Sequence, residues 1–393
     1  MSDRIDLDKL VKAIRATVSS DKAFIGLHEP IFQGREKEYV VDCLETGWVS
    51  SVGKYVDRFE EMLAEYTGSF RAVAVVNGTA ALHVSLLLCG VRPEDEVICP
   101  ALSFIATANA IAYCGAVPHF ADSEESTLGI DPDKLDFYLN EIARIEGEHC
   151  YNKATGRRIK ALVAMHTFGH PVRLDRLMEV CLKYKIELIE DAAESLGSYY
   201  KGKHTGTLSK IGAISFNGNK IMTTGGGGAI LVQDENLGKL AKHLTTTAKV
   251  PHRWEFVHDH IGFNYRLPNL NAALGCAQLE QLPAFLGNKR VLAESYRENL
   301  QDVAGIRVFK EPENSRSNYW LNTILLDEAS MEQRDLVLQH LNDSGLMSRP
   351  AWTPMHQMKV YADCPRMDLL NAEDLLARIV NIPSSAFLGG NHE

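Results

Sequence analysis

Residues 211–234 read IGAISFNGNKIMTTGGGGAILVQD, and this stretch decides the fold that we expect. The runs IGAISF and GGAILVQD are short and apolar, which is typical of strands buried on both faces of a sheet. The turn between them carries Lys220 and four consecutive glycines, 225–228. Most lysines are solvated, and an isolated turn lysine would be interpreted that way. This lysine follows a predicted buried strand and precedes a backbone that other groups can approach closely.

Five upstream runs repeat the strand pattern and alternate with helical spacing. Between the first two, residues 79–89 place apolar side chains on one helical face, and Thr79 after Asn77-Gly78 can open that helix. The order of strand, glycine turn and helix predicts a large α/β domain over residues 71–280 with a mostly parallel sheet. The upstream runs are AVAVV (72–76), DEVICP (95–100), AVPHFAD (116–122), IKALVAMH (159–166) and KIELIEDA (185–192).

The flanking segments predict two further parts. Residues 1–70 contain the helical patterns DLDKLVKAIRATV and GREKEYVVDCLETG and are expected to form an N-terminal arm and a segment that packs on the large domain. Residues 281–393 are expected to form a connecting helix, broken near Pro283, and a small C-terminal α/β domain. In this domain we expect strands at 318–327 and 346–352 and helices at 332–345 and 371–383. A cleft between two closely packed domains is the natural site.

Composition excludes several classes of protein. The 393 residues carry a formal charge of -10, and no basic run interleaved with aromatics is present, so nucleic acid is not an expected partner. The first residues lack the positive and apolar regions of a signal peptide, and no apolar run is long enough to span a membrane. The eight scattered cysteines, without a CxxC pair, are expected to be reduced core residues of a cytoplasmic protein.

Two residues have the chemistry of a covalent cofactor site. A lysine in a desolvated loop can lose its proton, form an imine with an aldehyde and later move protons, which is the chemistry expected of Lys220. Asp191 ends an apolar run, at the sheet edge where α/β proteins bind ligands, and can pair with a protonated ring nitrogen. Asp191 as a cap of the following helix is the alternative, and the two interpretations are equally compatible with the residues alone.

A third signal is the stretch VNGTAAL, residues 76–82. Gly78 permits a tight turn, and the backbone N–H groups of Thr79 and Ala80 at a helix start can form a seat for a phosphate. An ordinary capped helix is the alternative interpretation of this stretch. The hydroxyl of Ser215 can join the same seat or belong to an ordinary strand residue. An imine lysine, a pyridinium partner and a phosphate seat together predict pyridoxal 5'-phosphate (PLP) as the cofactor.

The ordered motifs resemble the DegT/StrS-type nucleotide-sugar aminotransferases of PLP fold-type I, the aspartate aminotransferase-like fold. The resemblance covers nearly the whole chain. It implies an imine bond at Lys220, Asp191 at the pyridine nitrogen, Phe104 stacked on the cofactor ring, and Asn264 reaching the phosphate from a neighbouring subunit, hence a homodimer with shared sites. The motifs are GWVSSVGKYVDRFE, NGTAAL, CPALSFIATANAI, LVAMHTFG, IEDAAESLGS, SFNGNKIMTTGGGG, HDHIGFNYRLPNLNAALG and PMHQMKVY.

Two positions depart from the pattern of the family. Many members have glutamate where this chain has Gly226, and glutamine where it has Glu194. Glu194 is therefore expected to alter a hydrogen bond to the cofactor or the substrate. For the substrate, the resemblance implies six residues near the sugar and the mouth of the pocket: Trp48, Ser50, Ser51, His258, Arg266 and His356. Arg266 suits a fork contact with a diphosphate, whereas each histidine is equally well explained as a structural residue.

Within the family, the segments FIGLHEPIF, TTTAKVPH and GFNYRLPNLNAALG resemble the branch that acts on UDP-4-keto-6-deoxy-N-acetylglucosamine in legionaminic- or bacillosamine-type pathways of bacterial surface glycans. The expected reaction moves an amino group from L-glutamate to the keto sugar. A PLP-dependent sugar dehydratase is disfavoured because such relatives replace the lysine with histidine, and a non-catalytic PLP-binding regulator is disfavoured by the intact motifs. No metal is expected, since His252, His258 and His260 lack the spacing of a zinc site.

Overall fold

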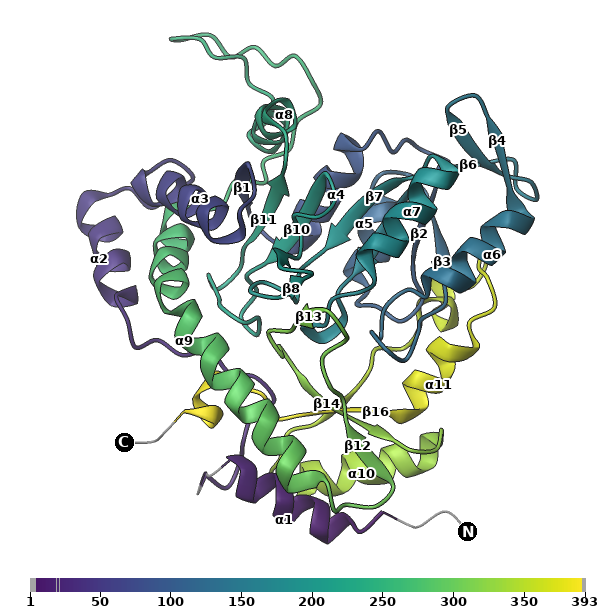
Figure 1. Cartoon of the computed structure of the whole chain (residues 1–393). Helices are drawn as coiled ribbons and strands as arrows, with labels where there is room; N and C mark the ends of the chain where they lie inside the picture. Colours follow the sequence, from purple (N-terminus) through teal and green to yellow (C-terminus); the bar gives the residue numbers. More distant parts are fainter. Residues whose placement is uncertain (1–4, 19, 21, 391–393) are drawn as a thin grey trace.

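A nine-stranded mixed sheet forms the centre of the larger unit in the computed structural model, which describes residues 5–18, 20 and 22–390 (Figure 1). Five adjacent strands run parallel to one another, from β10 to the β3 edge of the sheet. β11 runs antiparallel to both of its neighbours. The seven predicted strands are all present. In spatial order they are β1 (Arg71–Val75), β11 (Gly228–Val232), β10 (Ile211–Ser215), β7 (Glu187–Asp191), β6 (Arg158–Met165), β2 (Glu96–Pro100) and β3 (Val117–Ala121). The hairpin β4 (Ala143–Glu146) and β5 (His149–Asn152) adds the remaining strands.

Helices cover both faces of this sheet because its strands are apolar on both faces. In β1, Val73 and Val75 join one core, whereas Ala72 and Ala74 join the other. The first core lies under α4 (Gly78–Leu88), α5 (Ala106–Tyr113), α6 (Pro132–Ile142), α7 (Leu174–Tyr184) and the short η1 (Thr167–Gly169). The second lies under α2 (Glu36–Thr46), α3 (Lys54–Thr67) and the first half of α9 (Asn269–Leu300). Helix α8 (Glu235–Thr245) packs near the β1 edge.

The smaller unit is built on a four-stranded antiparallel sheet. Its order is β12 (Ile306–Val308), β14 (Asn322–Leu326), β16 (Ile379–Ile382) and β15 (Arg349–Pro350). Helices α10 (Met331–Asp343), α11 (Leu370–Arg378) and the second half of α9 accompany it, with the short η2 (Met355–Gln357), η3 (Lys359–Tyr361) and η4 (Ala386–Gly389). A third small sheet, β13 (Ser315–Arg316), β8 (Tyr199–Tyr200) and β9 (Lys203–His204), joins the two units.

Two predicted elements were wrong in the C-terminal part. The predicted helix at 371–383 ends at Arg378, and β16 begins at the next residue and pairs with both β14 and β15. Ile379, Val380 and Ile382 are fully buried, which suits β-branched residues in a strand. The helix expected to break near Pro283 is instead one helix, α9, with this proline inside. Proline removes one hydrogen bond, and packing on both sides of it holds the helix together.

The N-terminal segment divides between the two units. Helix α1 (Leu7–Val18) buries Leu10 and Ile14 in one core with Ile324 and Val380 of the small sheet, whereas α2 and α3 pack on the large unit. Because α9 also runs through both units, the domain limits at residues 70 and 280 stay a proposal. All eight cysteines are unpaired, and six of them are buried, as expected for reduced core residues.

Membrane-spanning segments were searched for among the described residues. None of their helices combines the length and the apolar character needed to cross a bilayer.

Replacing Ile382 with alanine tests the assignment of β16. Loss of a fully buried isoleucine should lower the free energy of unfolding by about 2–5 kcal/mol. Leu370→Ala in neighbouring α11 is the control, because Leu370 is 63% exposed and its loss should change stability by less than about 0.5 kcal/mol. Chemical denaturation followed by circular dichroism measures both. Equal, small effects would place Ile382 outside the core.

Candidate active site

A cavity of about 350 Å³ opens at the carboxyl ends of β7 and β10 and at the start of α4. Its volume lies in the range of roughly 300–1,000 Å³ that is usual for small-molecule sites. Trp320 and Trp352 close the cavity from the C-terminal part of the chain, so it lies between the two units. Seven of the predicted cofactor residues line it: Gly78, Thr79, Phe104, Asp191, Glu194, Ser215 and Lys220.

Lys220 reaches into this cavity from the turn after β10. Its backbone N–H donates to the carbonyl of Asn217 at 3.0 Å, which tightens the turn. Its Nζ lies 3.1 Å from Glu194 Oε1 and 3.9 Å from the centroid of the Trp320 ring. The side chain is 12% exposed, so these two groups, more than water, surround the amine. A desolvated lysine nitrogen with this access is placed to attack an aldehyde.

Asp191 ends β7 and is fixed by two hydrogen bonds. Thr107 Oγ1 donates to Oδ2 at 2.8 Å, and the backbone N–H of Ala193 donates to Oδ1 at 3.2 Å. Burial raises the pKa of Asp191 above its ordinary value, against the opposing effect of these hydrogen bonds and of Lys220. A positive ring nitrogen beside Asp191 would relieve the cost of burying its charge. The carboxylate therefore suits a pyridinium partner.

Glu194 is the second buried carboxylate of the cavity. Its Oε2 accepts the backbone N–H of Phe168 at 2.9 Å, and its Oε1 accepts from Lys220. Burial raises the pKa of Glu194, and the Lys220 charge opposes this effect. At Gly226, the other departure from the family pattern, an added Cβ would meet no atom within 4 Å. Space for a side chain is thus available there, and the glycine is not required by packing.

The start of α4 forms the predicted anion seat, but its available N–H donors are those of Gly78 and Thr79 instead of Thr79 and Ala80. Asn77 caps the helix, and its side chain accepts the N–H of Ala80 at 2.7 Å, so the N–H groups left at this turn are those of Gly78 and Thr79. A Cβ on Gly78 would lie 2.9 Å from Ser215 Cβ, and one on Gly228 would lie 2.5 Å from the Asn77 carbonyl carbon. The glycines thus allow the turn and the hydroxyl of Ser215 to meet around one small anion.

These residues fit PLP on the chemistry of their donors. A lysine amine, a buried carboxylate and a helix start beside a hydroxyl lie around one cavity, and each matches a different group of the cofactor. Phe104 is half exposed at the cavity wall, 6.4 Å between ring centroids from Trp352, and offers a flat surface for the ring.

The other predicted residues lie outside this cavity. Asn264 and His258 are exposed on the segment after α8, where Arg266 Nε donates to Asn264 Oδ1 at 3.2 Å. Trp48 lines a separate surface pocket beside α2 and α3, and the neighbouring Ser50 is exposed and Ser51 half-buried. His356 Nε2 lies 2.9 Å from Glu373 Oε1, an ion-pair contact with α11. Within one chain, none of these seven contributes to the wall around Lys220.

Three residues of the site were missed from the sequence. Thr107 fixes Asp191, whereas Trp320 and Trp352 enclose the amine of Lys220. Trp320 Nε1 donates to the carbonyl of Asn219 at 2.7 Å, which locks the tryptophan against the Lys220 turn. The indole in NYWLN was interpreted only as part of a strand, and no local pattern indicates that it folds back over residue 219.

A second cavity, of about 420 Å³, adjoins the first and shares Asn219, Trp320 and Trp352 as walls. Arg349 and His28 line it. Arg349 donates to the carbonyl of Ser348 at 3.1 Å and, among the residues that the structure describes, pairs with no carboxylate. Burial lowers the pKa of His28 well below its ordinary value. The second cavity thus offers Arg349, a cation without a carboxylate partner among the described residues, and Glu29 also lines it.

Comparison with known proteins shows the class to which this fold and site belong. Residues 30–392 match the DegT/DnrJ/EryC1/StrS aminotransferase family, and the chain belongs to it. The protein is a PLP-dependent aminotransferase with the fold of that class. The aminotransferase activity and the PLP cofactor predicted from the sequence are thus confirmed.

Particular relatives support this assignment over most of the chain. A GDP-perosamine synthase of Escherichia coli O157:H7 is 38% identical over 92% of this chain and 93% of its own. The putative pyridoxal phosphate-dependent aminotransferase EpsN of Bacillus subtilis is 39% identical, over 86% and 84%. The crystal structure of the aminotransferase TlmJ from Streptoalloteichus hindustanus superimposes with a TM-score of 0.81 at 30% identity, covering 92% and 93%.

Glu194→Gln tests whether the buried pair with Lys220 matters for turnover. Because burial raises the pKa of Glu194, its charge is lost at a higher pH than that of an ordinary glutamate as the solution is acidified. The acid limb of kcat/KM should therefore shift to lower pH or vanish in the variant, with about a tenfold loss at neutral pH. Glu187→Gln, at the other end of β7, is the control. An unchanged acid limb in Glu194→Gln would assign it to another group.

Proposed function

We propose that this chain transfers an amino group from L-glutamate to the carbonyl carbon of a 4-keto-6-deoxy sugar carried on a nucleotide, for the synthesis of bacterial surface glycans. The observation that carries the proposal is the convergence of Lys220, Asp191 and the start of α4 on one cavity. The relatives named GDP-perosamine synthase and dTDP-4-dehydro-2,3,6-trideoxy-D-glucose 4-aminotransferase support the sugar class.

Each residue has a distinct task in this proposal. PLP, when bound, serves as an electron sink for the carbon that exchanges its amino group. The Nζ of Lys220, once free of the cofactor, carries the proton between the two carbons of the exchange. Asp191 holds the ring nitrogen protonated, and Glu194 keeps the amine directed toward the cavity. Phe104, Trp320 and Trp352 cover the site and exclude water.

The adjoining cavity is where we place the substrate beyond the reacting carbon. Both substrates carry negative groups: the carboxylates of glutamate and the diphosphate of the nucleotide sugar. Arg349 is the cation that this cavity offers for one of them, in a position close to Trp320 and Trp352. The sequence indicated a UDP-linked 2-acetamido sugar, whereas relatives at 34–38% identity are named for GDP-perosamine. The experiment must therefore distinguish between UDP and GDP as the nucleotide that carries the 4-keto-6-deoxy sugar.

We also propose a homodimer in which each site borrows residues from the second chain. The segment after α8 projects beyond the rest of the chain (Figure 1) and exposes large apolar side chains. Trp254, Phe256 and Ile261 are 68%, 78% and 88% exposed. Such a concentration of apolar surface is typical of a protein interface. Asn264 and Arg266 lie at the base of this segment, outside the cavity of their own chain, as residues given to a partner would.

Two other functions were considered. A sugar dehydratase on this fold is disfavoured because Lys220 is present and faces the cavity. A regulator without turnover is disfavoured because the amine, the carboxylates and the anion seat are all in place.

Lys220→Arg should retain the fold and lose at least about 10²-fold in turnover, because arginine forms no imine and holds its proton. The assay follows the visible absorption of the cofactor after adding glutamate, and then its return on adding a 4-keto-6-deoxy sugar linked to UDP or to GDP. The nucleotide that restores the wild-type spectrum identifies the substrate. Wild-type rates in the variant, or no response of the wild type to glutamate, would contradict the proposal.

Mixing two inactive variants tests the shared sites. Lys220→Arg and Asn264→Asp each disable one half of a shared site, the second by placing a negative charge near the phosphate. In a mixed dimer one of the two sites then receives only wild-type residues. After denaturation and reassociation in equal amounts, about a quarter of wild-type activity should return. Sites built within single chains would show no recovery.

A further inference from the structure

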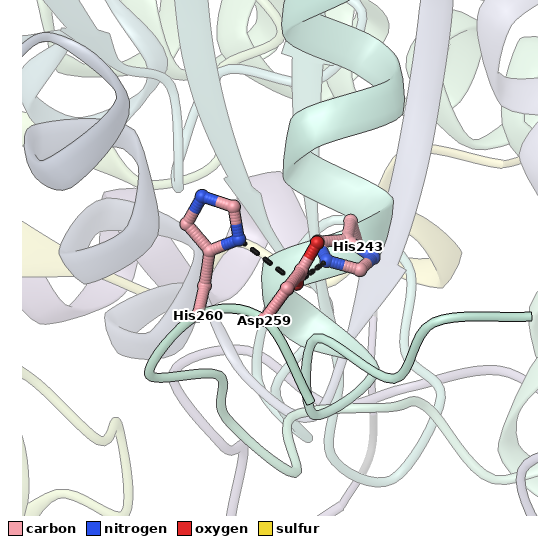
Figure 2. A group of neighbouring side chains, drawn as sticks. All are labelled: His243, Asp259 and His260. Carbon is pink, nitrogen blue, oxygen red and sulfur yellow. Dashed lines mark hydrogen bonds and ion pairs between the residues drawn. The ribbon is translucent and has the colours of Figure 1, made fainter. Parts of the chain in front are cut away.

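We propose that His243, Asp259 and His260 form a binding site for one divalent transition-metal ion of the zinc type, at the base of the segment after α8. His243 lies in the last turn of α8, and Asp259 and His260 lie on the returning limb of that segment (Figure 2). One ligand atom from each residue, two imidazole nitrogens and a carboxylate oxygen, lies within 4.8 Å of the others.

The three side chains already converge on one point. Asp259 Oδ1 lies 2.6 Å from His243 Nε2 and 2.9 Å from His260 Nδ1, as the dashed lines in Figure 2 show. Zinc binds such atoms at about 2.0–2.2 Å, which separates neighbouring ligand atoms by a little over 3 Å. An ion thus fits after a shift of a few tenths of an ångström. His260 and Asp259 are about half exposed, so their side chains are free to make this shift.

The backbone holds the cluster in place before any ion arrives. The two limbs of the segment pair, with Val250 N–H donating to the carbonyl of Val257 at 2.8 Å and Thr247 N–H to that of Phe263 at 3.0 Å. Ala248 N–H donates back to the carbonyl of His243 itself at 2.8 Å. Gly262 allows the limbs to approach, because a Cβ there would overlap the Thr247 backbone. Little ordering entropy is therefore left to lose on binding.

The electrostatics favour a cation at this point. Among the described residues, the two imidazoles are the only ion-pair partners of Asp259. Nearby cations are engaged elsewhere: Lys242 pairs with Glu60 at 2.7 Å, and Lys249 lies over the ring of Phe256. The carboxyl end of α8, which bears His243, adds its partial negative charge. An aspartate carboxylate is ionised near neutral pH, so Asp259 adds a negative charge.

The donor set selects the kind of ion. Two imidazoles and one carboxylate suit zinc, copper or nickel, whereas calcium and magnesium require oxygen ligands. Three protein ligands leave a further coordination position, which water fills. Because metal ligands must be deprotonated, zinc binding should weaken as the solution is acidified. The sequence argument against a metal considered His252, His258 and His260 and missed His243, which lies 16 residues before Asp259 in the chain.

Calorimetric titration of the untagged, cofactor-loaded enzyme with zinc chloride, after chelator treatment, tests the site. We expect one Zn²⁺ per chain and no binding of Ca²⁺. His243→Ala and Asp259→Asn should each weaken zinc binding by more than about tenfold, the loss that even an outer-shell partner can cause. His252→Ala, on the same segment, and His149→Ala, on the distant β4–β5 hairpin, are the controls and should bind zinc like the wild type.

An intact visible band of the cofactor in each variant shows that it has folded. Zinc binding that is equally weak in the wild type and in every variant would mean an adventitious ion only, and would overturn the proposal. The same conclusion would follow if His252→Ala reduced the affinity as much as His243→Ala. Loss of zinc binding in the two ligand variants alone would support it.

Discussion

The close approach of β11 to the turn before α4 is the constraint on which the site depends. β11 pairs with β1 on one side and β10 on the other, so the residues that leave β1 and β10 meet across its first residue, Gly228. A side chain there would collide with the backbone of Asn77. The run of glycines thus brings the anion seat beside Ser215, and the turn after β10 then directs Lys220 into the same space. The positions of the anion seat and of Lys220 therefore depend on the close contact between Gly228 and the backbone of Asn77.

The protein's own charged groups do not balance in the cavity. Two buried carboxylates, Asp191 and Glu194, face one lysine, and burial raises the pKa of both acids. A cofactor with a positive ring nitrogen supplies the charge that the protein alone does not. This imbalance is costly for an empty site, so the binding of such a cofactor beside the two carboxylates would also stabilise the fold.

The sequence predicted the large sheet well because its parallel strands are short runs of mostly apolar, buried residues, such as Leu188 and Ile189 before Asp191 in β7. Prediction failed where the decisive contacts are distant in the chain. IVNI follows α11 without a glycine or proline between them, so only its pairing with β14 reveals a strand. Likewise Trp320 joins the site through the carbonyl of Asn219, and the Ala80 N–H is taken by the side chain of Asn77. Local sequence patterns do not show which of two possible partners takes a given hydrogen-bond donor.

Helix α9 has a mechanical consequence. Its first half belongs to the core under α3 and its second half to the core of the small sheet, so a single rod of backbone hydrogen bonds joins both walls of the cleft. The two units cannot swing apart about a loose linker. Any opening of the cleft along this connection must bend α9. The helix should bend most easily at Pro283, where one backbone hydrogen bond is missing.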